Sequence, residues 1–521
     1  MWGCWTAADR GVVWEKAVLK GSKTIVCGCL LGAAIMTGST VALAQSVPPA
    51  STEDESAGGP MGSQAQPGVR PPRSQPRAAV AVPGGQTGTP NLPQAIRWTE
   101  DWSQPVSKDA PLIDRIKHIP IGSDDIYLSL GGEARAYYTA WDHQNAGRTA
   151  NDANDPVQRR LRLLADLHMG PHVRAFVELG DNREYGSSLV TPPNRGPFDV
   201  EQAFLDVTVP LGKAGKLTLR PGRFEMPLGN GKLVTLRDGV NQRVLYQGLR
   251  ATYALPGKIS VDTFAVRPVN IKDGEFNNAP NHTQSFHGVY VSAPHVVAGF
   301  GVDGYWFQVK RDTALNAQGR ASENRSSWGA RLWQRTATWD LDVEGTYQSG
   351  RFGTKDISAW AMMMDGGYTF PKVALQPRLG LRANVFSGDG NAGNDTLGTF
   401  VAPAPRYQML NAGVLFNYSN LMNLNPTLTL KPARSVTIVT GAQLYWRHRI
   451  ADGAYVGPAG ASFASASARR IGTAMEIDIS WQATKRLQFG VANSYFMPSK
   501  SLESVGGKYG NYFGAYTSLR F

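Results

Sequence analysis

Apolar and polar residues alternate along most of the chain from Ile126 onward. In one clear stretch, the apolar Leu161 and Leu163 alternate with the charged Arg160 and Arg162. A period of two is the repeat of a β-strand whose two faces meet different surroundings. The pattern therefore predicts an all-β chain in which each strand has an apolar face and a charged face.

Two kinds of connection separate the predicted strands. Short ones centre on residues 169–171, 210–215, 255–257, 293–294, 336–338, 370–372, 431–433 and 482–484. Long, polar, glycine-rich ones cover residues 142–156, 185–198, 227–242, 270–283, 311–323, 350–356, 388–422, 450–469 and 498–508. Short turns at one end and long loops at the other are typical of a transmembrane β-barrel.

The number of connections predicts the number of strands. If both ends of the barrel lie on the short-turn side, a barrel of 18 strands needs eight short turns and nine long loops, which are the numbers found above. Eighteen is an even number, as bacterial barrels require. Residues 406–418 also have strand character and could form a loop hairpin or a strand extension. A barrel of 16 strands is therefore the alternative. A soluble antiparallel sandwich also alternates, but it gives no reason for one class of connections to be short.

In a barrel the charged face must point inward. A charge on the lipid face at mid-bilayer costs roughly 2–4 kcal/mol for Arg or Lys. We therefore expect a water-filled lumen lined by arginines, with acidic partners between them. The arginines on the charged faces are Arg135, Arg160, Arg162, Arg174, Arg250, Arg331, Arg335, Arg378, Arg382, Arg447 and Arg449. The acidic partners are Glu133, Asp166, Glu178, Asp342, Glu476 and Asp478. Aromatic residues near strand ends, such as Trp446 and Trp481, fit the interfacial girdles of a membrane protein.

The first part of the chain differs from the strand region. Residues 1–44 predict an export signal, with lysines before the apolar run 25–36 and a small-residue cleavage site near Ala44. Residues 45–97 are rich in Pro, Gly and Ser and predict a disordered periplasmic linker. Residues 98–125 form a lead-in, and residues 126–521 form the predicted barrel. The last strand ends on Phe521, which resembles the assembly signal of bacterial outer-membrane barrels.

The amino-acid composition limits the kinds of ligand and partner that the chain can bind. The three cysteines, Cys4, Cys27 and Cys29, all lie in the predicted signal, so the mature chain offers no disulfide and no thiol ligand. The formal net charge is +12, but no Lys/Arg-rich helix suggests nucleic-acid binding. Acidic small molecules or polymers are the better class of partner. We predict no cofactor.

Several sequence segments resemble the alginate export family of outer-membrane proteins. They are Arg220-Pro221-Gly222-Arg223-Phe224-Glu225-Met226, residues 231–243, 387–391, 396–400, 420–431, 445–447 and 472–481, and Phe496-Met497-Pro498. The resemblance covers nearly all of residues 126–521. It implies a monomeric barrel of 18 strands that passes a polyuronate outward through an arginine-lined constriction.

The resemblance also implies which arginines line the pore. On this chain they correspond to Arg160 or Arg162, Arg223, Arg243 or Arg250, and Arg447 and Arg449. Two positions depart from the family pattern: Val244 replaces a second arginine, and Gln247 replaces an acid between an aromatic residue and a glycine. These departures leave the identity of the polymer open.

Arginine suits a pore for anions because it stays charged and presents a planar fork to a carboxylate. The alternative is that such arginines form wall salt bridges that only stiffen the barrel. The acidic pair Glu476 and Asp478 is better explained as salt-bridge partners than as a catalytic pair, so we predict no enzyme activity. Asp389, Asn391 and Asp395 form a weak candidate for a Ca²⁺ site, with a plain turn as the alternative.

The sequence thus predicts an outer-membrane channel for anionic solutes or an acidic exopolysaccharide. Its expected partners are outer-membrane lipid, that polymer or small anions, and periplasmic export proteins. A small-solute nutrient porin on the same scaffold is the first alternative. An outer-membrane enzyme or adhesin whose loops act outside is the second.

Overall fold

The computed structural model describes residues 93–148, 153–188, 194–316, 318–457, 461–463 and 467–521. They belong to one compact unit, Arg73–Phe521. The predicted export signal and nearly all of the predicted linker lie outside the described residues. Within the described residues, no helix is both long enough and apolar enough to cross a membrane.

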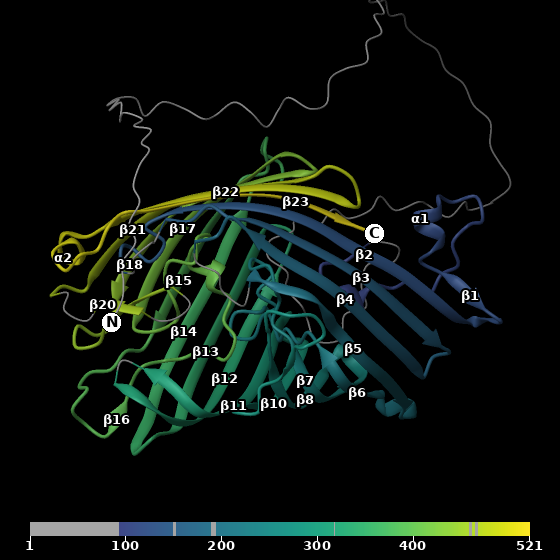
Figure 1. The fold of residues 1–521 in the computed structure, drawn as a ribbon, viewed down its shortest axis with the longest axis horizontal. Coiled ribbons are helices and arrows are strands. Elements are labelled where there is room, and N and C mark those ends of the chain that lie inside the picture. Colours follow the sequence, from purple (N-terminus) through teal and green to yellow (C-terminus); the bar gives the residue numbers. More distant parts are fainter. Residues whose placement is uncertain (1–92, 149–152, 189–193, 317, 458–460, 464–466) are drawn as a thin grey trace, which may run out of the picture. The chain divides into compact units, whose positions relative to one another are not determined.

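The unit is a closed antiparallel barrel of 18 strands, as predicted (Figure 1). Each strand pairs with its neighbour in the barrel, and β23 returns to pair with β2, where Arg520 lies opposite Glu133. In chain order the strands are β2 (Ser123–Asp142), β3 (Val157–Met169), β4 (Val173–Tyr185), β5 (Gly196–Pro210), β6 (Lys216–Phe224), β7 (Tyr246–Ala254), β8 (Ser260–Asn270), β10 (Gln284–Val297), β11 (Phe300–Asn316), β12 (Gly319–Arg335), β13 (Trp339–Phe352), β14 (Lys355–Thr369), β15 (Arg378–Phe386), β17 (Leu421–Ala433), β18 (Val436–Arg447), β21 (Arg470–Gln482), β22 (Leu487–Pro498) and β23 (Gly510–Arg520).

Smaller elements lie in the connections and before the barrel. The short strands are β1 (Ile119–Ile121), β9 (Ala279–Pro280), β16 (Thr396–Leu397), β19 (Ala454–Val456) and β20 (Ala461–Phe463). The short helices are η1 (Arg97–Thr99), α1 (Leu112–Arg115), η3 (Gly212–Ala214), η4 (Pro256–Lys258), η5 (Tyr407–Met409) and α2 (Lys500–Glu503).

The alternation in the sequence sorts residues between the two faces of the wall. On β3, Leu163 is 60% exposed, while its neighbour Arg162 is 2% exposed. The same holds on β21, where Met475 is 52% exposed and Ala474 is fully buried. The apolar faces therefore form the outer surface, and the charged faces line the lumen.

The connections follow the predicted scheme with three differences. The turn expected at residues 293–294 lies at 298–299, because the register shifts between Ala293 and Val297 and β10 continues through the shift. The long loops predicted at residues 311–323 and 350–356 are wrong. There β11 and β12, and β13 and β14, extend as paired strands to tight hairpins. These extensions are mostly polar, so they carry no regular alternation of apolar and charged residues.

The uncertain residues 406–418 contribute no strand to the wall. Within residues 387–420 the only strand is the two-residue β16, which pairs in parallel with β14. Residues 407–409 form the short helix η5 instead of a hairpin. The alternative of 16 strands is therefore excluded.

An N-terminal segment, residues 94–121, folds against the turn end of the barrel. Arg97 donates hydrogen bonds to the carbonyls of Gly132 and Phe521, both at 2.6 Å. Glu100 accepts from Arg97 and lies 3.6 Å from the Lys117 ammonium, all three side chains being buried. The Trp98 ring lies 4.3 Å from the Arg220 guanidinium of β6. These contacts tie the segment to β2, to β6 and to the last residue of the chain.

Candidate pore constriction

Two of the long connections fold into the lumen. The first inner loop, residues 225–245, joins β6 to β7, and the second inner loop, residues 387–420, joins β15 to β17. Each contacts side chains from the inward face of distant strands: Arg160 of β3 donates to the Asn241 carbonyl at 2.8 Å, and Asn411 donates to Glu476 of β21 at 2.8 Å. The sequence does not reveal this infolding, because loop residues have no periodicity that points inward or outward.

The two inner loops also bind each other. Thr235 donates its backbone N–H to the Ala404 carbonyl, and Ala404 donates to the Leu233 carbonyl, both at 3.0 Å. Farther along, Arg406 donates its backbone N–H to the Lys232 carbonyl at 3.1 Å. The loops thus form one connected barrier inside the barrel.

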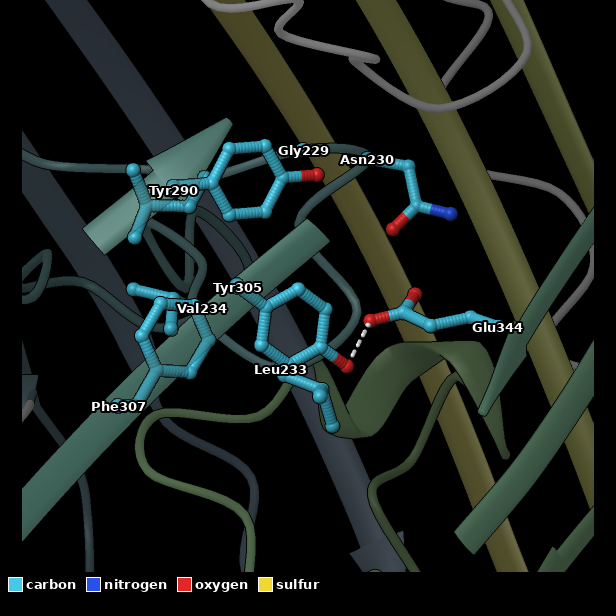
Figure 2. Close-up of a pocket in the computed structure, with 9 residues that line it drawn as sticks. Gly229, Asn230, Leu233, Val234, Tyr290, Tyr305, Phe307 and Glu344 are labelled. Atoms are coloured by element: carbon cyan, nitrogen blue, oxygen red, sulfur yellow. Dashed lines mark hydrogen bonds between the residues drawn. The ribbon is translucent and has the colours of Figure 1, made fainter. Parts of the chain in front are cut away.

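An apolar contact anchors one side of the first inner loop. Leu233 and Val234 pack beside Tyr305 and Phe307 of β11 around a small hollow (Figure 2). Leu233 and Val234 are 3% and 1% exposed. Burial of side chains of this size stabilises the packing by roughly 1.5–3 kcal/mol each.

Gly229 explains how the loop approaches so closely. A Cβ at this position would lie 2.2 Å from the Tyr290 hydroxyl, and the residue has a φ of +57°. Both the left-handed backbone and the lack of space require glycine here. On the same wall, the Tyr305 hydroxyl donates to Glu344 at 2.9 Å, as Figure 2 shows.

An ionic contact anchors the other side of the loop. The carboxylate of Asp238 accepts from Arg160 at 2.6 Å and from Arg243 at 2.8 Å. Arg135 donates to the Asp238 carbonyl at 2.6 Å and lies 3.9 Å from its carboxylate. We call these four residues the Asp238 cluster. The three arginine side chains are buried, but that of Asp238 is 41% exposed. The carboxylate therefore faces open space in the lumen.

The charges around Asp238 fix its ionisation. Partial burial by itself would raise the pKa of the Asp238 carboxyl. The positive charges of Arg243, Arg160 and Arg135 outweigh this effect and hold the pKa well below its ordinary value. Asp238 is thus ionised throughout the physiological pH range.

Four glutamates extend the cluster. Arg162 lies 3.0 Å from Glu178 and 3.0 Å from Glu225, and 3.7 Å from Glu201. Glu133 lies 3.4 Å from Arg520 and 3.9 Å from Arg160. The resulting network is balanced in formal charge, with its cations on Arg135, Arg160, Arg162, Arg243 and Arg520 and its anions on Glu133, Glu178, Glu201, Glu225 and Asp238. Such pairing offsets the high cost of burying each charge.

The other predicted pore arginines have separate partners. Arg223 donates to the carbonyls of Val200 and Asn278. Arg250 pairs with Asp262 at 2.8 Å, and Arg382 pairs with Asp365 at 2.7 Å while donating to the Met409 carbonyl. These three therefore act as wall or loop contacts in this structure.

Arg447 and Arg449 differ from each other. Arg447 is fully buried and donates to the carbonyls of Ala468, Ile450 and Asp452, which holds the connection after β18 in place. Arg449 lies in that connection with an exposed side chain. The structure does not join either one to the Asp238 cluster.

The predicted acidic partners mostly meet basic side chains. Asp166 accepts from Arg174 at 2.7 Å, and Asp342 binds both Arg331 and Lys232. Glu476 instead accepts from the second inner loop, and Asp478 is exposed. Sequence reasoning missed Glu201, Glu225 and Asp238 as members of the network. Glu225 and Asp238 stand in the segments that resemble the alginate export family, which is the signal that was available.

The weak calcium candidate forms a hydrogen-bonded turn. Asp389 accepts from the Asn391 backbone N–H, and Asn391 accepts from that of Gly393, both at 3.0 Å. Asp395 contributes its carbonyl to Asp356. In the part of the chain that the structure describes, no three His, Cys, Asp or Glu side chains are grouped so that they could hold a metal ion.

A closed barrel with an apolar exterior, a charged lumen and inward-folded loops defines the class of outer-membrane channels. The family model described as "Alginate export" matches residues 126–516. The chain belongs to this family. A comparison with curated proteins gives no match.

Solved structures of other outer-membrane proteins have the same fold. They include Pseudomonas aeruginosa OpdK with vanillate, with 10% identity, 76% of this chain and 98% of that chain covered, and a TM-score of 0.51. Acinetobacter baumannii OccAB1 has 9% identity and a TM-score of 0.51, with 76% of this chain and 96% of that chain covered. P. aeruginosa OccK2 in complex with glucuronate has 10% identity and a TM-score of 0.50, with 76% of this chain and 98% of that chain covered. At such low identity the likeness concerns the fold alone.

Proposed function

We propose that this chain passes anionic solutes, or an acidic polysaccharide of the alginate type, through its lumen and past the Asp238 cluster. The observation that carries this proposal is a carboxylate open to the lumen and held by buried arginines. Those arginines form a site with the shape and charge that a carboxylate needs. Because Asp238 occupies the exposed side of this site, an incoming carboxylate would bind by exchanging with Asp238, which keeps it from binding too tightly.

Weak binding to arginines that are already paired suits the passage of an anion. Conduction requires a site that attracts an ion without trapping it. Unpaired arginines in the lumen would retain a polyanion, because each added ion pair multiplies its affinity. In the Asp238 cluster an internal carboxylate already satisfies the guanidinium groups. A uronate would exchange with it at little net free energy, and the polymer could move from one such contact to the next.

A small-solute channel is the second candidate, and one specific observation favours it. The two inner loops are bonded to each other across the lumen through Leu233, Thr235 and Ala404. A barrier of this kind suits single small acids better than a folded polymer. Two of the solved structures with the same fold contain a small carboxylate, vanillate in one and glucuronate in the other.

Reversal potentials of the purified full chain in planar bilayers test the proposal. In a KCl gradient we expect anion selectivity, and a polyuronate added on the turn side should block the current. A neutral polymer of equal length is the control. Block by polyuronate supports export, whereas conduction of glucuronate without polymer block supports the small-solute channel. Cation selectivity would refute both.

We further propose the setting of this channel. It would lie in the outer membrane of a Gram-negative bacterium as a monomer, after cleavage of the signal predicted for residues 1–44. Periplasmic export proteins would deliver the polymer to its turn side. Crosslinking of the full chain in cells, followed by mass spectrometry, tests for both a partner and a second copy.

A further inference from the structure

Three exposed arginines gather at the loop end of β18 and β21. Arg449 follows β18, and Arg469 and Arg470 stand at the start of β21. Arg469 donates its guanidinium to the His448 carbonyl at 2.9 Å, and its own carbonyl accepts from the Arg447 backbone at 2.7 Å. Burial lowers the pKa of His448, and the nearby charges of Arg449 and Arg469 lower it further. The three arginines therefore form one positive patch, which we call the rim patch.

One arginine of the rim patch, Arg470, faces the outside of the barrel wall. The Arg470 guanidinium lies 5.3 Å from the centre of the Trp446 ring and donates to the Thr473 hydroxyl at 2.7 Å. Trp446 lies on the outer face, because its neighbour Tyr445 is fully buried and reaches the second inner loop with its hydroxyl. Arg470 thus extends along the outer wall.

An apolar band begins directly beside the patch. On the outward face of β21 the next large side chains are Met475, 52% exposed, and further along Trp481, 47% exposed. A second outward tryptophan, Trp360 of β14, is 41% exposed and meets the His448 ring edge-on at 5.4 Å. Tryptophans at the edge of an apolar band mark the boundary between acyl chains and head groups. The rim patch therefore stands at head-group level.

The rim patch differs from other arginines at the loop end. Exposed Arg351 pairs with Asp356 at 3.2 Å, and exposed Arg195 pairs with Asp273 at 3.3 Å. Among the described residues, no acidic side chain lies within ion-pair distance of Arg449, Arg469 or Arg470. Here three like charges stay together without an acidic partner in the described part of the chain.

We propose that the rim patch binds the phosphate groups of an anionic lipid in the outer leaflet, whose acyl chains lie on the apolar band of β18 and β21. Guanidinium groups bind phosphate through two parallel N–H donors, and they are less strongly hydrated than ammonium groups. The lipid would supply the missing counter-charge. Its chains would cover Met475 and the outer face of Trp446. This site lies outside the lumen and is independent of the transported solute.

Native mass spectrometry of the full chain in detergent micelles tests the site. The probes are lipid A with both phosphates, lipid A after removal of its phosphates, and inorganic phosphate. We expect the wild-type chain to bind the phosphorylated lipid at least about tenfold more tightly than the dephosphorylated one, a preference of the size that charge-assisted hydrogen bonds give. The variant Arg469→Gln with Arg470→Gln should lose that preference.

Arg351→Gln is the matched control, since it removes one exposed arginine at the same end of the barrel and should keep the preference. Heat-modified mobility on gels checks that each variant is folded. If the double variant does not fold, Arg470→Gln alone should lower the preference and Arg470→Lys should restore part of it. Equal binding of both lipids by the wild type, or an unchanged preference in the folded variant, would overturn the proposal. Full competition by millimolar inorganic phosphate would also overturn it, because the site would then serve free phosphate.

Discussion

Asp238→Asn isolates the charge that faces the open lumen. The substitution removes one negative charge but keeps an oxygen that can accept from Arg160 and Arg243, now 2.6 and 2.8 Å away. The backbone contacts of the first inner loop, such as those of Arg135 and Arg160 with the Asp238 and Val240 carbonyls, do not depend on the carboxylate. We therefore expect the loop to stay in place while the cluster gains one net positive charge.

The size of the effect follows from Coulomb's law. An anion that passes about 8 Å from the missing charge gains roughly 0.5 kcal/mol if the lumen behaves like bulk water, and roughly 2 kcal/mol at an effective dielectric constant near 20. These limits correspond to an increase of roughly two- to thirtyfold in anion permeability and an equal decrease for a cation, so the ratio of anion to cation permeability should rise by roughly fivefold or more. Screening by salt should move the result toward the lower limit.

Reversal potentials in a tenfold KCl gradient measure this ratio directly. Asp356→Asn is the control, because its carboxylate pairs with Arg351 at the exposed rim and both side chains are more than half exposed. It should leave the ratio unchanged. If Asp238→Asn leaves the ratio unchanged or lowers it in a folded protein, then ions do not pass the Asp238 cluster and our reasoning about the constriction is wrong.

Three further predictions concern stability and the N-terminal segment. Arg447→Met should lower the free energy of unfolding by roughly 1.5–3 kcal/mol, because it removes charge-assisted hydrogen bonds to buried carbonyls. Urea titration, followed by the band of folded protein on a gel, measures this change. Unchanged stability would mean that these bonds contribute nothing. Gly131→Val should release the N-terminal segment to protease, since even a Cβ at this position would lie 2.3 Å from the Lys117 ammonium; a segment as protected as in the wild type would contradict this. Burial lowers the pKa of Lys117 to about 8 despite the attraction of Glu100. The docked segment must therefore release a proton that the undocked one keeps, and docking should strengthen as the pH rises from about 8 toward 10.5. The fluorescence of Trp102 can follow this change, which Lys117→Met should abolish.

The strands could be predicted because each of them has lipid on one face and the lumen on the other. Leu163 meets lipid and Arg162 meets the lumen, so the sequence itself must alternate wherever a strand crosses the membrane. Beyond the membrane both faces meet water, and the constraint disappears. That is why the polar ends of β11 and β12, paired from Ala314 with Ala321 onward, were predicted as loop.

The candidate site could be predicted only in part. The alternation of inward and outward residues along β2 and β3 places Arg135, Arg160 and Arg162 in the lumen. The family resemblance adds Arg243 to these predicted lumen residues. Their partner Asp238 lies in a loop 78 residues after Arg160. No local pattern joins such distant residues, because the contact arises from how the first inner loop folds inside a closed wall. A pattern of inward arginines therefore could not show that they are already neutralised.

The two anchors of the first inner loop respond to different perturbations. The ionic anchor at Asp238 weakens when an anion competes or when salt screens its charges. The apolar anchor, where Leu233 packs beside Tyr305, is insensitive to both. An anion that exchanges with Asp238 therefore loosens one side of the loop while the other side holds. We expect the loop to behave as a hinged barrier that stays attached to β11 during transport. A spin label at residue 240, beside the ionic anchor, should gain mobility in high salt or with glucuronate, and a label at residue 235, beside the apolar anchor, should not.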